Sequence, residues 1–546
     1  MSSPLSSRAQ NYYWFTIMAL VISTSLIAGC FWSTEHLNGA GWDEALYINQ
    51  SYKDISSFEK GGVRGLIKSI FFLDRETPPA YRLLAFPLIL IIGVNPGALR
   101  LLSLFFLGIS LFFVYLCAKH LAGPLAGAFA ATFLAICPII IGSSMYYGTE
   151  YPLYFAVSAT LYFLFLNLSR EQTQSEKQSW LSLGFILGIG GLAKSPFVLI
   201  VSPVMLFVVI LVKCRVIAKP SFIFLLKSLF CAVVIALPWW IYNFQSAIGR
   251  TLHAGGYKRH SLGPKDSFET WVKWLELLNL SVFGPPLCFL IIAFVLYFFI
   301  KLVFGQIQMN LTQKIAVCLC LSSAIPLVVL SSMGENQNPR LLSPSLIPLA
   351  VAIGIIAVTS QWTSSRCLIM ITTVVFCVQL SVMVTPLLKS FDYGLNNLSP
   401  NLVGPTLAKI MQKPEQWDWS KLREICNRRR IIKPSISYLG NASTFNPPQI
   451  SYPWIKVNED VHVTWLWRYE QGEINWNKVM ESVNSSDVVL TAPGFMGDQL
   501  DDKQNLDNQH NTELVQRLQK DSRFIKPLKL RMGRFNSVQI LVFLKQ

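Results

Sequence analysis

Residues 13–32 read YWFTIMALVISTSLIAGCFW, and this uncharged stretch decides the class of the fold. A helix of about 20 residues is roughly 30 Å long, which matches the hydrocarbon core of a bilayer. Arg8 precedes the stretch, as in a signal peptide, but the apolar run is too long and residues 29–32 show no small-residue cleavage pattern. We therefore expect a retained membrane anchor.

The chain keeps this apolar character up to residue 386. Hydrophobic residues make up 52% of the 546 residues and charged residues 14%, whereas soluble domains have about 25% charged residues. Apolar segments lie near residues 12–34, 80–94, 98–118, 124–141, 150–168, 180–193, 196–212, 222–243, 281–304, 314–333, 341–359 and 366–386. The sequence thus predicts an all-α polytopic membrane bundle.

Segment 80–94 differs from the other segments, because it is short, contains Pro87 and carries Arg82 near its start. If it is a juxtamembrane helix that does not span, about 11 transmembrane helices remain and the cations of the short loops become cytoplasmic. The chain is then a multi-pass protein of the cell membrane with a cytoplasmic N-terminus. This topology explains the net charge of +16 without nucleic-acid binding.

The predicted topology places three large features on the outer side. Two are the loops 35–97 and 244–280, which belong to a transmembrane domain over residues 1–390. The third is the polar tail, residues 391–546, predicted as a soluble extracytoplasmic α/β domain. Its expected elements are strands at 436–439, 488–491 and 538–543 and a helix at 511–519.

Both outer loops contain helical patterns. Residues 44–58 and 63–73 carry apolar faces, and Gly61-Gly62 separates them. Such helices lie in the plane of the membrane surface. Residues 268–275 show the same spacing, although a chance amphipathic stretch accounts for it equally well.

Asp43 and Glu44 lie about ten residues beyond the end of the first apolar run. Two carboxylates so near a membrane exit are able to take a proton from an acceptor, or they form part of a solvated polar loop. The 11 Cys show no CxxC pair and no Cys/His ligand spacing. No cofactor is required; a divalent metal is chemically possible beside a carboxylate pair, but no third ligand is identifiable.

Five stretches, in chain order, resemble one family. They are GWDEALY at 41–47, ETPPAY at 76–81, GGLAKSP at 190–196, LPWW at 237–240 and PRLLSP at 339–344. Together they resemble the GT-C membrane glycosyltransferases of the protein mannosyltransferase and aminoarabinose transferase (ArnT-like) group. The resemblance implies a polyprenyl-phosphate sugar donor, transfer on the outer face and inversion at the anomeric carbon.

Two positions depart from the family pattern. Thr77 stands where the family often has Lys or His, and Leu341 stands where it has Tyr. These departures leave the contacts of the donor phosphate open. Arg75, Arg82 and Lys258 are therefore further candidates for them.

Glycosyl transfer requires a base for the acceptor and stabilisation of the departing phosphate. We predict that Asp43 is the base, which contributes about 10²–10⁴-fold, and that Glu44 orients the acceptor or Asp43. Arg340 has a planar fork suited to phosphate oxygens; the alternative is that it caps a span. Lys194 lies at a Gly-rich break, where a buried ammonium is usually functional; the alternative is a Lys that extends to the interface. Glu150 contacts sugar hydroxyls or is only a helix N-terminal carboxylate.

The predicted protein is an integral-membrane glycosyltransferase of the GT-C type with a soluble C-terminal α/β domain. Its partners are the polyprenyl-phosphate sugar donor, a glycolipid, glycan or protein acceptor, and membrane lipid; nucleic acid is not a partner. The alternative is a polytopic transporter or lipid-glycan flippase. That class is expected to show charges inside spans and repeated halves, which the sequence lacks.

Overall fold

The computed structural model describes residues 7–35, 42–168, 179–214, 219–255, 261–264, 267–388, 418–440, 445–467, 474–493, 504–532 and 538–546. The chain divides into two compact units. The first comprises residues 1–35, 75–85 and 98–412, and the second comprises residues 36–74, 86–97 and 413–546. The second unit therefore includes most of the predicted outer loop 35–97 together with the tail.

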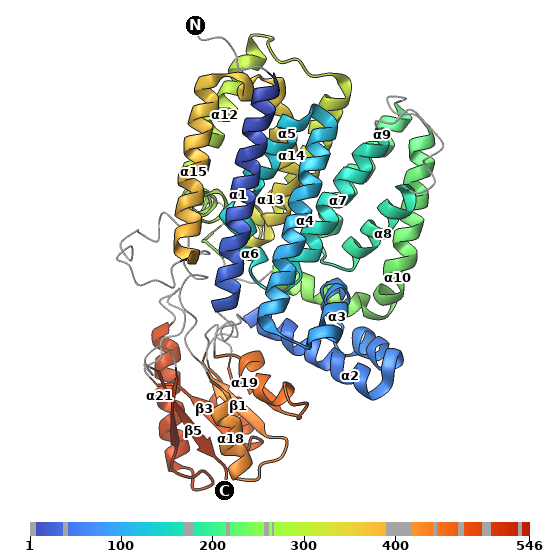
Figure 1. The fold of residues 1–546 in the computed structure, drawn as a ribbon. Helices are drawn as coiled ribbons and strands as arrows, with labels where there is room; N and C mark the ends of the chain where they lie inside the picture. The colour runs from blue at the N-terminus through green and yellow to red at the C-terminus, as the bar shows by residue number, and fades with distance from the viewer. Residues whose placement is uncertain are drawn as a thin grey trace. The chain divides into compact units, whose positions relative to one another are not determined.

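Long apolar helices make up the first unit (Figure 1). Within the described residues, nine helices are long and apolar enough to cross a membrane. Eight of them coincide with α1 (Ser7–Glu35), α4 (Pro96–Ala122), α7 (Glu150–Leu168), α9 (Pro196–Lys213), α10 (Lys219–Gly255), α12 (Pro285–Val303), α13 (Leu311–Met333) and α15 (Arg366–Leu388). The ninth, Pro339–Thr359, consists of α14 (Leu346–Thr359) and the two 3-10 turns before it. The prediction of a polytopic helical bundle is confirmed.

Two of the predicted spans, 124–141 and 180–193, do not form long straight helices. The segment 124–141 consists of α5 (Pro124–Ala135) and α6 (Pro138–Ser144), which are bent by 68° and together count as a tenth span. The bend lies before Pro138, which lacks the N–H group that would continue the helix. Two apolar helices are shorter, α3 (Ala80–Ile92) and α8 (Ser179–Gly191). The segment predicted not to span is thus a short helix.

Glycines allow two helices of the first unit to pack closely. A Cβ atom at Gly184 of α8 would lie 2.6 Å from Cβ of Cys231 on α10. A Cβ at Gly188, one turn later, would lie 2.8 Å from Cβ of Ile235. Small residues spaced by four let apolar helices approach to backbone contact. The α8–α10 pair therefore depends on these two glycines.

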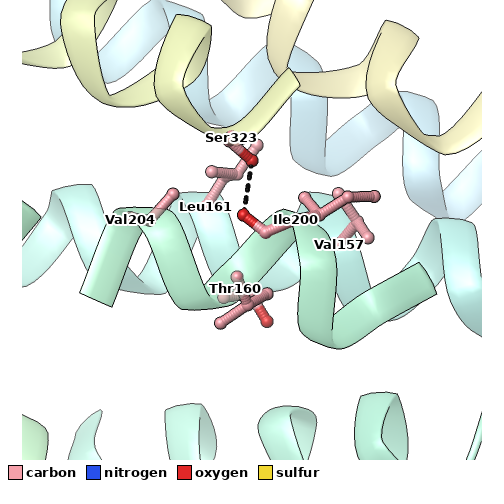
Figure 2. A pocket seen from close by; sticks show the side chains of 7 residues that line it. Val157, Thr160, Leu161, Ile200, Val204 and Ser323 are labelled. Carbon is pink, nitrogen blue, oxygen red and sulfur yellow. Dashed lines mark hydrogen bonds between the residues drawn. The ribbon is translucent and has the colours of Figure 1, made fainter. Parts of the chain in front are cut away.

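A serine on a neighbouring helix forms a hydrogen bond to α9 close to its internal proline. Pro203 cannot donate a backbone hydrogen bond within the helix. Ser323 of α13 donates its Oγ hydrogen to the carbonyl of Ile200 at 2.9 Å, beside a small apolar pocket (Figure 2). Hydroxyl side chains commonly satisfy carbonyls near a proline break in an apolar bundle. This bond joins α9 to α13.

The tail forms a five-stranded sheet in the order β2-β1-β3-β5-β4. The strands are β1 (Ser435–Leu439), β2 (His462–Trp465), β3 (Val488–Thr491), β4 (Leu528–Met532) and β5 (Val538–Leu544). Strand β1 pairs in parallel with β2 and β3, whereas β5 pairs antiparallel with β3 and β4. The predicted α/β tail is confirmed.

Helices cover both faces of this sheet. Side chains of α18 (Ser420–Arg428) and α19 (Pro447–Ile455) share one core with alternate residues of β1 and β3. Side chains of α20 (Trp476–Asn484) and α21 (Gln504–Lys520) share the other core. The alternation is visible in β3, where Val488 and Leu490 lie in the first core and Val489 in the second.

The second unit also contains α2 (Trp42–Phe72), the helix that begins with the acidic pair. Gly62 interrupts it with φ 57° and ψ −145°. Only glycine adopts this backbone conformation without strain. The expectation of two helices separated at Gly61-Gly62 is confirmed, and α11 (Phe268–Leu277) likewise forms at the predicted stretch 268–275.

Candidate active site

Three predicted site residues meet in the first unit. Glu150 is the first residue of α7, Lys194 lies between α8 and α9, and Arg340 lies in the 3-10 turn η4 (Pro339–Leu341). Nζ of Lys194 lies 2.7 Å from Oε1 of Glu150. Nε of Arg340 lies 2.9 Å from the same oxygen. One carboxylate oxygen therefore joins two cations that are far apart in the sequence.

Backbone contacts fix the turn that carries Lys194. The ring N–H of Trp240 donates to the carbonyl of Gly191 at 2.8 Å, where α8 ends. The backbone N–H of Ala80 donates to the carbonyl of Leu192 at 2.8 Å. These bonds connect the turn to α10 and to the start of α3. Because the backbone is held on both sides, the ammonium group is directed to Glu150.

A chain of side chains fixes the turn that carries Arg340. The backbone N–H of Arg340 donates to Oδ1 of Asn338 at 3.0 Å. The carbonyl of Arg340 accepts from Oγ of Ser343 at 2.7 Å, and the hydroxyl of Tyr154 donates to this Oγ at 2.6 Å. Tyr154 lies one helical turn after Glu150 on α7. The same helix therefore supplies the carboxylate and the support for the arginine turn.

Tyr154 and Ser343 were not among the predicted site residues. A signal exists for each of them. Tyr154 is four residues after Glu150, and residues with this spacing share a helix face. Ser343 is three residues after Arg340, a common spacing for a hydroxyl that bonds a backbone carbonyl.

The cluster carries a net positive charge. The side chain of Glu150 is 7% exposed, whereas those of Lys194 and Arg340 are 21% and 33% exposed. Two cations and one carboxylate leave one positive charge, and the accessible part of the cluster belongs to the cations. Ammonium and guanidinium groups held in this way are suited to bind phosphate oxygens.

The other predicted cations are placed differently. Arg82, in α3, is buried with 1% exposure. The preceding residue, Tyr81, accepts a hydrogen bond at its carbonyl from the hydroxyl of Tyr151. Arg75 is exposed and lies before α3. Lys258 lies outside the residues that the structure describes.

The acidic pair is in the first turn of α2. Asp43 is partly exposed and Glu44 is buried, with 2% exposure. The N-terminus of a helix favours a negatively charged side chain, because its backbone N–H groups point towards that end. Across the described ranges, no three His, Cys, Asp or Glu side chains form a group able to hold a metal ion.

The chain is similar to known membrane glycosyltransferases. Residues 76–242 match the dolichyl-phosphate-mannose-protein mannosyltransferase family. This range contains Glu150 and Lys194, but not Asp43 or Arg340. No curated protein matches the chain in sequence.

Solved structures show the same fold over nearly the whole chain. The structure of ArnT from Cupriavidus metallidurans in the apo state has a TM-score of 0.56 and 11% identity, covering 96% of this chain and 97% of that chain. The structure of the same protein bound to undecaprenyl phosphate has a TM-score of 0.52 and 12% identity, with the coverage 96% and 97%. The archaeal oligosaccharyltransferase AglB from Archaeoglobus fulgidus, in complex with an inhibitory peptide and a dolichol-phosphate, has a TM-score of 0.53 and 10% identity, covering 88% and 69%. The fold is therefore shared despite low sequence identity.

Proposed function

We propose that the chain transfers a sugar from a polyprenyl-phosphate donor to an acceptor at the outer face of the membrane. The proposal is supported by the fold that the chain shares with ArnT and by the match of residues 76–242 to the dolichyl-phosphate-mannose-protein mannosyltransferase family. ArnT in one compared structure is bound to undecaprenyl phosphate, and AglB in another to a dolichol-phosphate. These lipids support the same class of donor for this chain. The acceptor is a glycolipid, a glycan or a protein.

The cluster of Glu150, Lys194 and Arg340 is the observation that carries this proposal. A departing lipid phosphate gains negative charge as the glycosidic bond breaks. Prearranged cations lower the free energy of that transition state, because they need no reorganisation during the reaction. Lys194 and Arg340 already lie 2.7 and 2.9 Å from a shared carboxylate oxygen, so both are held where a phosphate oxygen is able to bind. Arg75 and Lys258 are further candidates for the donor phosphate.

The proposed reaction is a single displacement. The acceptor oxygen or nitrogen forms a bond to the anomeric carbon while the bond from that carbon to the phosphate oxygen breaks. Asp43 accepts the acceptor's proton, and the polyprenyl phosphate leaves with its electron pair, bound by Lys194 and Arg340. Attack opposite the leaving group inverts the anomeric carbon. Glu44, buried beside Asp43, orients it or the acceptor.

Mass spectrometry of membrane glycolipids, glycans and proteins from cells with and without the chain tests this proposal. A sugar lost together with the chain identifies the acceptor class and the transferred group. Purified chain in proteoliposomes, supplied with a polyprenyl-phosphate sugar and that acceptor, is expected to release polyprenyl phosphate. Movement of the donor lipid across the bilayer without release would instead support the flippase alternative.

Asp43→Asn tests the base. Transfer is expected to fall by about 10²–10⁴-fold, the usual contribution of a general base, with donor binding retained. Glu59→Gln is the matched control, because it also removes one charge from α2, at an exposed position. Turnover by Asp43→Asn at the rate of the control would exclude Asp43 as the base.

A further inference from the structure

We infer that the C-terminal domain positions the acidic helix, with Asn49, Tyr52, Ser56 and Lys60 of α2 as positioning residues for Asp43. The role given to Asp43 rests on the proposed function. The contact itself lies within the second unit and is independent of that function.

The contacts lie along one face of α2. Positions 49, 52, 56 and 60 are separated by three, four and four residues, a spacing that aligns side chains on a helix. Nδ2 of Asn49 donates to the carbonyl of Pro448 at 2.9 Å. The rings of Tyr52 and Tyr452 meet edge to face with centroids 6.0 Å apart. Contacts therefore begin two turns after Asp43.

The same face continues to a turn of the tail. Oγ of Ser56 donates to Oδ1 of Asn458 at 2.7 Å, and Nζ of Lys60 donates to this oxygen at 3.3 Å. Asn458 has φ 59°, in the left-handed region that asparagine tolerates better than most residues. Its side chain thus presents one acceptor to two consecutive turns of α2.

The tail residues that make these contacts belong to a fixed part of the domain. Helix α19 starts at a capped N-terminus, where the side chain of Asn446 accepts from the N–H of Gln449 at 3.0 Å. Ile450 and Trp454 of α19 are 0% and 1% exposed in one of the two sheet cores. Motion of α19 relative to the sheet would expose these side chains, so α19 is a firm support for α2.

A second contact joins α2 to the residues just before α4. The hydroxyl of Tyr52 donates to the carbonyl of Val94 at 3.0 Å. Asn49 is 3% exposed, so its hydrogen bond to Pro448 is shielded from water. Residues 86–97 belong to the same unit as α2 and the tail. The helix is therefore held on two sides near its N-terminal half.

The helix transmits this restraint to Asp43. Asn49 lies six positions after Asp43, about 9 Å along the helix axis. The non-helical residue of α2 is Gly62, which lies beyond all four contacts. Isolated helix ends fray, and a catalytic group displaced by about 1 Å loses up to roughly 10²-fold in rate. Docking the helix on α19 therefore keeps its first turn in one position.

The combined variant Asn49→Ala and Asn458→Gly tests the positioning role. Glycine keeps the left-handed backbone at position 458 while it removes the acceptor for Ser56 and Lys60. The expected result is a kcat lowered by about tenfold with the donor KM within about twofold, since the donor contacts lie in the other unit. Arg517→Ala is the matched control. Arg517 pairs with Glu513 within α21 and takes no part in the contacts with α2 named above.

Cross-linking gives a readout that does not depend on activity. Ser56→Cys with Asn458→Cys is expected to be bridged in membranes by a short reagent that carries two thiol-reactive maleimide groups, whereas neither single variant forms this bridge. The cross-linked protein is expected to keep its transfer rate, and the cross-link is expected to restore kcat when added to Asn49→Ala.

Three results would overturn the inference. One is failure of the pair to cross-link, and another is a kcat of the combined variant equal to that of the control. The third is an inactive cross-linked protein, because the domain would then have to leave α2 during turnover. If the unmodified chain transfers no sugar while the cross-link still forms, the proposed function fails and so does the role of Asp43, but the contact between α2 and the tail stands.

Discussion

Glu150→Gln separates the two effects of the carboxylate that joins Lys194 and Arg340. The amide oxygen of glutamine still accepts hydrogen bonds from both cations, so their positions are kept. The negative charge that competes with the donor phosphate is removed. We therefore expect this variant to bind the polyprenyl-phosphate donor more tightly than the unmodified protein does.

The magnitude follows from the geometry. A phosphate oxygen bound to the same two nitrogens would lie about 5 Å from the Glu150 carboxylate, where two unit charges repel by about 3 kcal/mol at an effective dielectric of 20 and by about 0.8 kcal/mol in water. The 21% and 33% exposure of the two cations places the cluster between these limits. A gain of about 1–2 kcal/mol corresponds to a donor KM lowered by roughly 5- to 30-fold.

The assay is transfer in proteoliposomes at several donor concentrations, with product inhibition by polyprenyl phosphate measured in parallel. Both constants are expected to fall together, because the product carries the same phosphate. Glu150→Ala keeps neither the charge nor the acceptor, so its donor KM is expected to rise. Glu269→Gln is the matched control, since Glu269 is 74% exposed and pairs with Lys273 in α11.

A donor KM that stays constant or rises in Glu150→Gln would refute this account, provided that the protein remains folded. Thermal unfolding in detergent checks the fold, because removing one partner of a buried ion pair costs up to about 3–5 kcal/mol. The partial exposure of the cations reduces this cost here. If the donor KM of the folded variant is not lowered, the donor phosphate must bind elsewhere than at Lys194 and Arg340.

Three further predictions concern single side chains. Arg340→Ala is expected to raise the donor KM by at least about tenfold, the loss of a charge-assisted hydrogen bond, with the acceptor KM unchanged; steady-state kinetics with each substrate varied measures this. Gln379 donates to the carbonyl of Phe283 at 3.0 Å inside the bundle, so Gln379→Met is expected to destabilise the protein by about 1–2 kcal/mol, measured as a lower melting temperature in detergent. The hydrogen bond from Arg423 holds the pKa of Glu459 below its ordinary value of 4.5. Such a carboxyl group stabilises the fold above its unfolded pKa and loses this effect as the pH falls through the folded pKa. Glu459→Gln is therefore expected to lower the melting temperature of the tail slightly at pH 7, and this difference is expected to shrink as the pH falls below 4.5.

Periodicity and turn residues predicted much of the fold, because these signals are local. Gly62 marks the break in α2, and the apolar residues of β1 (Ser435–Leu439) and β3 (Val488–Thr491) mark central strands. Strands β2 and β4 were not predicted. They are the two edges of the sheet, and β4 alternates Leu with Lys and Arg, so neither has a continuous apolar run.

The candidate site was less accessible from the sequence. Lys194 and Arg340 were identified by their motifs, but the contact of both with Glu150 joins residues 44 and 190 positions apart. No local pattern specifies such a pairing. Tyr154 and Ser343 follow from the fold in the same way, since a hydrogen bond between them requires α7 and the turn after Arg340 to be neighbours.

The break at Gly62 has a practical consequence for handling the protein. Beyond it, Val63, Ile67 and Phe72 are 65%, 51% and 44% exposed. Water in contact with these side chains is unfavourable by about 25 cal/mol for each Å² of apolar surface, so amphiphiles will adsorb there during solubilisation. Short-chain surfactants bind to these exposed apolar side chains and displace α2, the helix that carries Asp43 in its first turn. Preparations in lipid nanodiscs should therefore retain activity that surfactant-extracted samples lose, even when both elute as a single monodisperse peak.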